Sequence, residues 1–418
     1  MQNILELREE RVRLQEALLK EHGGSLLSLR PNFPGGDKRN LYANFAVYSL
    51  FSDLVQKLPS KLLTTLYTEE GLTFILNTQM PAFEAKVITV SLEEGHPLGR
   101  LVDIDVYSQR QPEISRGDLG QAPRKCFLCG QDAVICTRSK AHSREAVSEY
   151  FIQKVVQLLV QKDKYRLHML EFSLLNELLR RVSLGCVTVY TNGVHLDMDF
   201  PLFLRSLRCL GEYGARLSSF DMKDFPSLRR FGLGMEAAMF KATDGVNTHK
   251  GAIFSHLLLL AGLCHAQSFN ELPIAIAHLA QGSLSDFASK ANSYGLRLYR
   301  ERGVLGVRGD AAQGFPKLFE QFLPFFHESS EDLDQTMLVI AENLVDTNVL
   351  TRCGTEYTKE YRELCKGVRS GRLELNILED FCLQHGISAG GAADMLSLTI
   401  LTSIIDKHFF ALKEVFKS

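Results

Sequence analysis

The sequence lacks a strong net charge of either sign. Its 47 lysine and arginine residues face 49 aspartate and glutamate residues, which leaves a formal net charge of −2 at pH 7. The chain therefore offers no electrostatic argument for binding nucleic acid or an anionic membrane surface. Long hydrophobic runs are also missing. The longest, residues 252–266, contains His256 and His265 and falls short of the ~20 residues that a membrane span needs, so we expect a buried helix and no membrane partner.

The N-terminal segment lacks the apolar core of a secretion signal, because charged residues occur from its first turn onward. The nine cysteines are an odd number. Without a secretion signal, we expect reduced thiols and a cytoplasmic protein. Internal repeats and low-complexity segments are not visible either. A chain of 418 residues with 45% hydrophobic and 23% charged residues is typical of a globular protein with more than one domain.

Hydrophobic patterning divides the chain into two parts. The first part mixes helices, expected at 3–22, 42–57 and 59–69, with strands, expected at 71–79, 85–93 and 96–108, and a glycine- and proline-rich loop at 22–40. Ser143 is a plausible N-cap for a long helix. From there on, helical periodicity recurs at 168–184, 200–215, 226–240, 251–266, 282–300, 333–345, 356–367, 373–384 and 391–416. We expect an α+β domain at 1–165 and an all-α domain at 166–418.

Two aspartates lie one residue apart in the apolar segment HPLGRLVDIDVYS. In a strand, Val102, Ile104 and Val106 would face the core, and Asp103 and Asp105 would face the other side together, ~6.5–7 Å apart. Such a pair fits either a solvated strand face or a Mg²⁺ site, because Mg²⁺ takes oxygen ligands and keeps positions for substrate phosphates. Spacing alone does not choose between them.

The same segment, together with NFPGGDKRN and SRGDLGQAPRKCFLCGQDAVICTRSKAHS, resembles the apo-citrate lyase phosphoribosyl-dephospho-CoA transferases over about residues 1–160. That family attaches a phosphoribosyl-dephospho-CoA group to a serine of the citrate lyase acyl carrier (gamma) subunit and releases pyrophosphate. The resemblance implies a nucleotidyltransferase-like fold in which Asp103 and Asp105 hold Mg²⁺. Arg100, Lys38 and Arg39 are candidate phosphate contacts, and the alternative is that they are ordinary surface charges.

Four metal-ligand residue types follow the aspartates. Cys126, Cys129, Cys136 and His142 have the spacing Cys-x2-Cys-x6-Cys-x5-His, which suits a closed structural Zn²⁺ site. One alternative is that the cysteines are small core residues. Another is that Arg138, Ser139, His142 and Ser143 contact substrate.

Three helix joints in the second part carry polar residues suited to phosphate: TNGVHLDMDF, ATDGVNTHKGAIF and GISAGGAADML. None is a Walker A loop, and helix caps or tight packing would explain them equally. These stretches and DTNVLTRCG resemble the triphosphoribosyl-dephospho-CoA synthases from about residue 168 to the C-terminus. That family is all-α and joins ATP to 3′-dephospho-CoA with displacement of adenine, so the two parts would form a bifunctional enzyme.

The resemblance suggests residue roles in the second part. Candidates for Mg²⁺–triphosphate binding are Asp197, Asp199, Asp346 and Asp394. His249 is a candidate for hydroxyl activation or substrate orientation, and Lys250 for phosphate contact. Candidate substrate contacts are His195, Asn247, Arg352, Gly390 and Gly391.

The segment VSLGCVTVYTNGVH departs from the synthase pattern. The family's prolines and lysine are absent around Gly185–Thr188, and Thr188 stands where an aspartate is expected. We therefore expect synthase activity to be reduced or to depend on another copy. The alternatives to a bifunctional enzyme are an active transferase joined to a degenerate helical half, and a non-catalytic adaptor for the carrier subunit.

Overall fold

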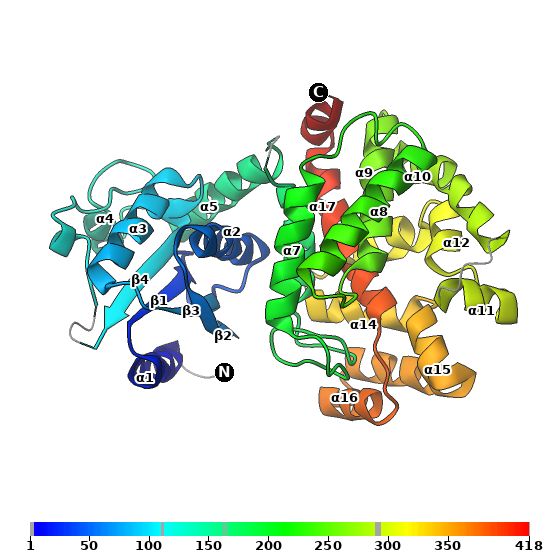
Figure 1. Ribbon diagram of the computed structural model, residues 1–418, viewed down its shortest axis with the longest axis horizontal. Coiled ribbons are helices and arrows are strands. Elements are labelled where there is room, and N and C mark those ends of the chain that lie inside the picture. Colours follow the sequence, from blue (N-terminus) through cyan, green and yellow to red (C-terminus); the bar gives the residue numbers. More distant parts are fainter. Residues whose placement is uncertain (1–3, 110–112, 162, 164, 289–293, 418) are drawn as a thin grey trace. The chain divides into compact units, whose positions relative to one another are not determined.

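The structure is a computed structural model that describes residues 4–109, 113–161, 163, 165–288 and 294–417 (Figure 1). Contacts divide the chain into two compact units, Met1–Leu159 and Val160–Ser418. The first unit combines helices with a sheet. The second is helical, and its described residues contain no strand. The expected order of an α+β region followed by an all-α region is therefore confirmed.

The first unit is built on a four-stranded antiparallel sheet with the strand order β2-β3-β1-β4. Its strands are β1 (Ser25–Pro31), β2 (Lys61–Thr68), β3 (Gly71–Thr78) and β4 (Val102–Ser108). Leu29 of β1 is in register with Ile104 of β4 and with Phe74 of β3, and all three are buried. Phe51 of α2 (Leu41–Lys57) stacks on Phe74 with ring centroids 4.2 Å apart. This face of the sheet therefore carries the core.

Four further helices complete the first unit: α1 (Ile4–His22), α3 (Ala82–Gly95), α4 (Ala133–Ser139) and α5 (Arg144–Leu159). Ser143 caps α5 as expected, because its hydroxyl accepts a hydrogen bond from the Ala146 amide at 3.1 Å. Arg11 of α1 forms an ion pair with Glu70 at 2.8 Å, and both side chains are only 7% exposed. This pair ties α1 to the turn between β2 and β3.

Three predictions for the first unit are wrong. Residues 59–69 form strand β2 instead of a helix. β2 lies at the sheet edge and is half-buried along most of its length, so apolar and polar positions do not alternate clearly. Residues 85–93 lie in helix α3 instead of a strand. Their buried positions, including Ala85, Thr89 and Leu92, have helical spacing, so packing overrides the β-propensity of the valines, isoleucine and threonine. The expected loop at 22–40 contains β1.

The second unit surrounds the long helix α17 (Gly390–Lys417), drawn in orange to dark red in Figure 1. α17 packs against α6, α9, α13 and α14. By length and composition α17 could cross a membrane, yet 72% of its apolar window is buried within the protein. The other helices are α6 (His168–Glu177), α7 (Phe200–Gly214), α8 (Phe225–Ala242), α9 (Lys250–His265), α10 (Leu272–Ala280), α11 (Tyr294–Arg302), α12 (Gly306–Ala312), α13 (Leu323–Glu328), α14 (Leu333–Asn343), α15 (Thr347–Arg369) and α16 (Leu375–Gln384).

The helical segments expected from periodicity are confirmed, with two corrections. Helix α6 ends at Glu177, so residues 178–184 of the expected segment 168–184 are not helical. The segment 282–300 is not a single helix. A 3-10 segment, η4 (Gln281–Ala288), and α11 lie on either side of residues 289–293, which are outside the described residues. Periodicity also missed the short helices α10, α12 and α13.

Candidate functional sites

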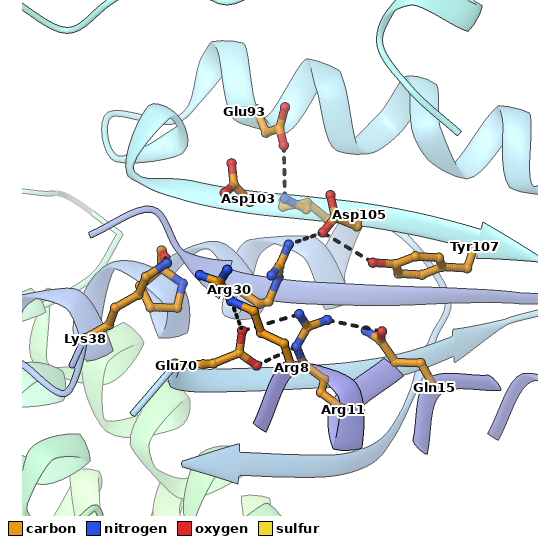
Figure 2. Close-up of polar contacts among 12 residues, drawn as sticks. Arg8, Arg11, Gln15, Arg30, Lys38, Glu70, Glu93, Asp103, Asp105 and Tyr107 are labelled. Carbon is orange, nitrogen blue, oxygen red and sulfur yellow. Dashed lines mark hydrogen bonds and ion pairs between the residues drawn. The ribbon is translucent and has the colours of Figure 1, made fainter. Parts of the chain in front are cut away.

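Strand β4 presents Asp103 and Asp105 on the face opposite the core, and Figure 2 shows their side chains near Arg30. Val102, Ile104 and Val106 are buried on the core face. The Asp103 and Asp105 side chains are 33% and 16% exposed, so both remain partly accessible. The alternation predicted from the sequence is therefore confirmed, and the two carboxylates share one face.

Arginines from two other segments meet these carboxylates. Arg30 of β1 is in register with Asp103 and donates to Oδ2 of Asp105 at 2.6 Å (Figure 2). Arg124 forms ion pairs with Asp103 and with the buried Glu93, each at 2.5 Å. Glu93 Oε1 also accepts a hydrogen bond from the Ile104 amide at 3.1 Å. The aspartate pair is thus held between two guanidinium groups, in a position to meet both a cation and phosphate.

Lys38 adds a third positive charge to this polar face. Its ammonium donates to the Pro31 carbonyl at 3.2 Å. Burial lowers the pKa of Lys38, and the nearby Arg30 lowers it further, although Asp103 partly opposes both effects. Arg39, by contrast, forms ion pairs with Asp37 and Glu69.

Arg100 lies beside the segment that carries the cysteines. Its guanidinium donates to the Lys125 carbonyl and lies 5.5 Å from the centroid of the Phe127 ring. The residues Cys126, Cys129, Cys136 and His142 come together, with one ligand atom from each lying within 4.8 Å of the others. The first unit therefore contains two adjoining features, a carboxylate–arginine face and a thiol–imidazole cluster.

In the second unit, Asp346 joins two helix N-termini. As the N-cap of α15, its Oδ1 accepts from the Asn348 amide at 2.8 Å, and its Oδ2 accepts from the Ala392 amide of α17 at 2.9 Å. A Cβ on Gly391 would lie 2.9 Å from this carboxylate, which explains the glycine there. Because backbone donors engage both oxygens, Asp346 acts first as a cap that joins α15 to α17.

Asp394, in the first turns of α17, reaches the start of α9. Its carboxylate accepts a hydrogen bond from the Ala252 amide, and a Cβ on Gly251 would meet its Oδ2 at 1.9 Å. Burial raises the pKa of Asp394 well above its ordinary value, and the neighbouring Glu177 and Asp346 raise it further. Three carboxyl groups therefore lie close enough to interact, which favours protons or a cation between them.

Glu177 is a member of this group that the sequence did not suggest. It lies at the end of α6, is 5% exposed and forms an ion pair with Arg180. Burial raises the pKa of Glu177 to about 7, although the ion pair with Arg180 opposes the shift.

His195 and Arg352 lie beside the start of α17. His195 Nε2 is 3.0 Å from the hydroxyl of Ser388, and its Nδ1 is 3.9 Å from Asp197. Burial and the nearby Arg352 lower the pKa of His195, and Asp197 partly offsets them. Arg352 donates to the Gly386 carbonyl at 3.0 Å. With Gly390 and Gly391 following Ser388, these candidate residues surround one end of α17.

The remaining candidates in the second unit have structural partners of their own. Asp199 caps α7 by accepting from the Leu202 amide at 2.8 Å. The same Asp-Phe-Pro sequence recurs at Asp224, which caps α8 in the same way. Asn247 Oδ1 accepts from the Lys250 amide at 3.2 Å, and the Lys250 ammonium pairs with Glu236.

His249 is buried rather than open to solvent. Its Nδ1 is 2.8 Å from the Ser206 hydroxyl, and its ring packs edge-on against Phe203 with centroids 4.9 Å apart. Burial, with a smaller contribution from His256, lowers the pKa of His249 to about 3. The imidazole is therefore neutral at physiological pH.

Comparison with known proteins relates each part of the chain to a known family. A family model described as apo-citrate lyase phosphoribosyl-dephospho-CoA transferase matches residues 1–158, and one described as ATP:dephospho-CoA triphosphoribosyl transferase matches residues 166–411. Protein CitXG of Haemophilus influenzae is 30% identical over 96% of this chain and 95% of its own length. The chain belongs to the CitXG family.

Other relatives support this assignment. Protein CitXG of Leuconostoc mesenteroides subsp. cremoris is also 30% identical, over 96% of each chain. The 2-(5″-triphosphoribosyl)-3′-dephosphocoenzyme-A synthase of Pectobacterium atrosepticum is 30% identical over 63% of this chain and 94% of its own length. The order of the two matched regions is the order expected from the sequence motifs.

The segment around Gly185–Thr188, which departs from the pattern expected for the synthases, is nevertheless well packed. A Cβ on Gly185, whose φ is +74°, would lie 1.8 Å from the Ile387 carbonyl oxygen. The Ala389 amide donates to the Leu184 carbonyl at 3.1 Å. Thr188 is buried, and its hydroxyl accepts from the Tyr190 amide at 3.2 Å. Thr188 therefore stabilises a local turn and supplies no carboxylate to the site.

The sequence analysis did not single out several residues that the structure adds to the two sites: Arg30, Glu93, Arg124, Glu177, Arg180 and Ser388. Arg124 and Ser388 lie within the quoted motifs, but no role was assigned to them. Arg30 and Arg124 lie far from the aspartates in sequence, so no spacing rule links them. A buried acid beside a basic residue was a weak signal for Glu177, which lies in the apolar segment FSLLNELLRR.

Proposed function

We propose that this chain makes the citrate lyase prosthetic group in its helical unit and attaches it in its sheet-containing unit. In the first reaction, a hydroxyl of 3′-dephospho-CoA attacks the ribose C1 of ATP, and adenine leaves. In the second, a serine hydroxyl of the apo-citrate lyase acyl carrier (gamma) subunit attacks the phosphorus that carries the ribosyl group, and pyrophosphate leaves. The main support is that one family model matches each part of the chain. Each matched range of residues also contains a cluster of carboxylates.

For attachment, Asp103 and Asp105 are the proposed Mg²⁺ ligands. The donor set fits this cation because two carboxylates share one partly exposed strand face. Bound Mg²⁺ would neutralise charge on the pyrophosphate leaving group. Arg30, Arg124 and Lys38 lie around the same carboxylates, so they are suited to hold the phosphate oxygens. The proposal includes a nucleotidyltransferase-like arrangement of this unit.

For synthesis, Asp394 and Glu177 are the proposed Mg²⁺ ligands. Asp346 would support Asp394 by joining the helices, since its own oxygens are engaged by backbone amides. The donor set fits because close carboxyl groups, of which Glu177 is buried and Asp394 half-buried, repel one another unless a proton or cation lies between them. Arg352 and His195, beside Gly390 and Gly391, are proposed substrate contacts. Asp197, close to His195, is a secondary candidate for triphosphate binding.

The neutral state of His249 affects its proposed role. An imidazole whose pKa is lowered to about 3 by burial can accept a proton only weakly at pH 7. His249 is therefore better suited to orient Ser206 and the start of α9 than to remove a proton. Lys250 and Asn247 remain candidates for phosphate contact at the same helix start.

The decisive experiment incubates the full chain with ATP, 3′-dephospho-CoA, Mg²⁺ and apo-acyl carrier subunit. We expect adenine in solution and a mass increase on the carrier equal to one prosthetic group. Asp103→Asn should block attachment while adenine release continues. Asp394→Asn should block adenine release, and pre-made triphosphoribosyl-dephospho-CoA should restore attachment. No modification of the carrier by the parent protein, with or without the pre-made intermediate, would refute the proposal.

A second candidate function has one specific observation in its favour. Thr188 stands where the synthases are expected to have an aspartate, and its hydroxyl is used within a turn. In this second function only the transferase is active, and the helical unit is a degenerate domain or an adaptor for the carrier subunit. The assay distinguishes this function, because the carrier would then be modified only when pre-made intermediate is supplied.

The free thiols of the nine cysteines are compatible with the proposed cytoplasmic location.

A further inference from the structure

The thiol–imidazole cluster of the first unit is not used by either proposed reaction. We propose that Cys126, Cys129, Cys136 and His142 bind one structural Zn²⁺ ion, with three thiolates and one imidazole as ligands. This inference does not rest on the proposed enzymatic function, because it concerns the folding of residues 124–143. Its support comes from the positions of the four side chains, the backbone around them and the small apolar core of the segment.

The distances within the cluster fit tetrahedral zinc. With Zn–S bonds of about 2.3 Å and a Zn–N bond of about 2.0–2.1 Å, ligand atoms lie about 3.5–3.8 Å apart. Here the Cys129 and Cys136 sulfurs are 3.4 Å apart, and His142 Nε2 is 3.3 Å from the Cys129 sulfur. All four ligand atoms lie within 4.8 Å of one another. A small contraction or expansion of the cluster would place one ion at its centre.

The backbone around Cys126 also suits a metal-bound thiolate. The amides of Leu128 and Cys129 donate hydrogen bonds to the Cys126 sulfur. Such donors stabilise negative charge on sulfur, and they arise because the chain turns tightly after the first ligand. The turn closes through the Cys126 amide, which donates to the Gln131 carbonyl at 2.6 Å, and includes Gly130 with φ at +73°. Backbone hydrogen bonds therefore already form the Cys-x2-Cys turn, and zinc binding would not have to bend the chain.

Few apolar contacts hold this segment in place. Val134 and Ile135 of α4 are 56% and 55% exposed, and Leu128 is 38% exposed. A short helix with its apolar side chains in water needs another source of stability. Two ligands from the turn, Cys136 from α4 and His142, three residues past the end of α4, would supply that stability by cross-linking these three parts. A closed set of four protein ligands leaves no position for substrate, so the ion is structural.

Zinc at this position would also organise the neighbouring carboxylate face. Arg124, two residues before Cys126, pairs with Asp103 and Glu93. The Lys125 carbonyl accepts from Arg100, and Phe127 lies under the Arg100 guanidinium. Phe127 also stacks on Tyr150 of α5, with centroids 5.5 Å apart. Loss of the ion would therefore release both Arg100 and Arg124 from fixed positions.

The test measures zinc in the full chain after tag removal, purified under reducing conditions without added metal. We expect one zinc per chain by mass spectrometry of the metal. Substitution with Co²⁺ should give the absorption bands of a tetrahedral, thiolate-bound ion. Cys129→Ser and His142→Ala should lower zinc content at least tenfold at equal protein concentration, whereas Cys209→Ser, a control in the second unit, should retain one zinc.

The Co²⁺ spectrum of the parent protein keeps the test valid if the variants fold poorly. The proposal would be overturned by a parent protein that holds less than about 0.1 zinc per chain and shows no cobalt–thiolate absorption. This threshold is about one tenth of the expected zinc content, the same factor expected for the ligand variants. A Cys129–Cys136 disulfide in freshly reduced and desalted protein, or unchanged zinc in both ligand variants, would also overturn the proposal.

Discussion

Gly251→Ala provides a sharp test of the carboxylate cluster in the helical unit. Gly251 lies in the first turn of α9, and a Cβ there would be 1.9 Å from Asp394 Oδ2, whereas real contacts exceed 3.0 Å. The carboxylate must then move by about 1 Å and lose its bond from the Ala252 amide. Overpacking costs about 1–3 kcal/mol, and an unpaired buried group costs about 1–3 kcal/mol more. The higher helix propensity of alanine relative to glycine offsets about 1 kcal/mol of this cost.

We therefore expect Gly251→Ala to lower the free energy of unfolding by about 1–5 kcal/mol, because the two penalties exceed the gain in propensity. Adenine release should fall at least tenfold, since a shift of about 1 Å in a positioned group costs up to about 100-fold in rate. Denaturant unfolding and adenine release from ATP plus 3′-dephospho-CoA measure the two effects. Attachment from pre-made intermediate should continue at the parent rate.

Two further variants separate the steric effect from the functional one. Gly232→Ala is the matched control, because its Cβ would contact only the flexible Leu257 side chain, at 3.3 Å. It should leave both measurements near those of the parent. Adding Asp394→Ala to Gly251→Ala removes the clash, so stability should recover while adenine release stays low. If Gly251→Ala is as stable as Gly232→Ala and releases adenine normally, the proposed role of Asp394 is wrong.

Three other predictions follow from the same contacts. Asp103→Asn and Asp105→Asn should each slow pyrophosphate release from pre-made intermediate by about 100-fold or more, the loss typical of electrostatic stabilisation; an unchanged rate would contradict the Mg²⁺ assignment. Arg124→Ala should lower the free energy of unfolding by about 3 kcal/mol because it leaves a buried carboxylate short of a partner, whereas Arg138→Ala should change it by less than about 0.5 kcal/mol. Burial raises the pKa of Glu177 from 4.5 to about 7, so its contribution to stability is fully present below pH 4.5 and is lost as pH rises through about 7. Glu177→Gln should flatten this decline in thermal unfolding of the metal-free chain, and an identical pH profile would count against it.

Much of the fold was predictable because the spacing of apolar residues indicates which side of a helix or strand is buried. β4 is the clearest case, since three buried residues alternate with Asp103, Asp105 and Tyr107. The prediction failed where the pattern of apolar residues is weak. β2 pairs along one edge only and has a register irregularity between Leu62 and Thr64, so its alternation is blurred. α3 contains β-branched residues, yet its packing against β4 decides its conformation.

The candidate sites were predictable where their residues are neighbours in sequence or lie in motifs that resemble those of a known family. The aspartate pair and the four proposed zinc ligands occur within short segments, so their spacing suggested them as candidates. Arg30 meets Asp105 through the pairing of β1 with β4, separated by 75 positions. That contact depends on strand register, which the sequence motif does not encode. Asp199 shows the opposite limit: a carboxylate in a suggestive motif can be used by a helix N-terminus, and only its partners reveal this role.

The different exposure of the two carboxylate clusters fits the two reactions proposed for them. Asp103 is 33% exposed on its strand face, and an open face is needed where the attacking serine belongs to a folded carrier protein. Glu177 and the supporting Asp346 are 5% and 7% exposed, and Asp394 is half-buried. A reaction at the ribose C1 of ATP must favour a substrate hydroxyl over water, and burial reduces access of water to the reacting carbon. A hydrolysis assay tests this reasoning, because ATP without 3′-dephospho-CoA should release adenine at least tenfold more slowly.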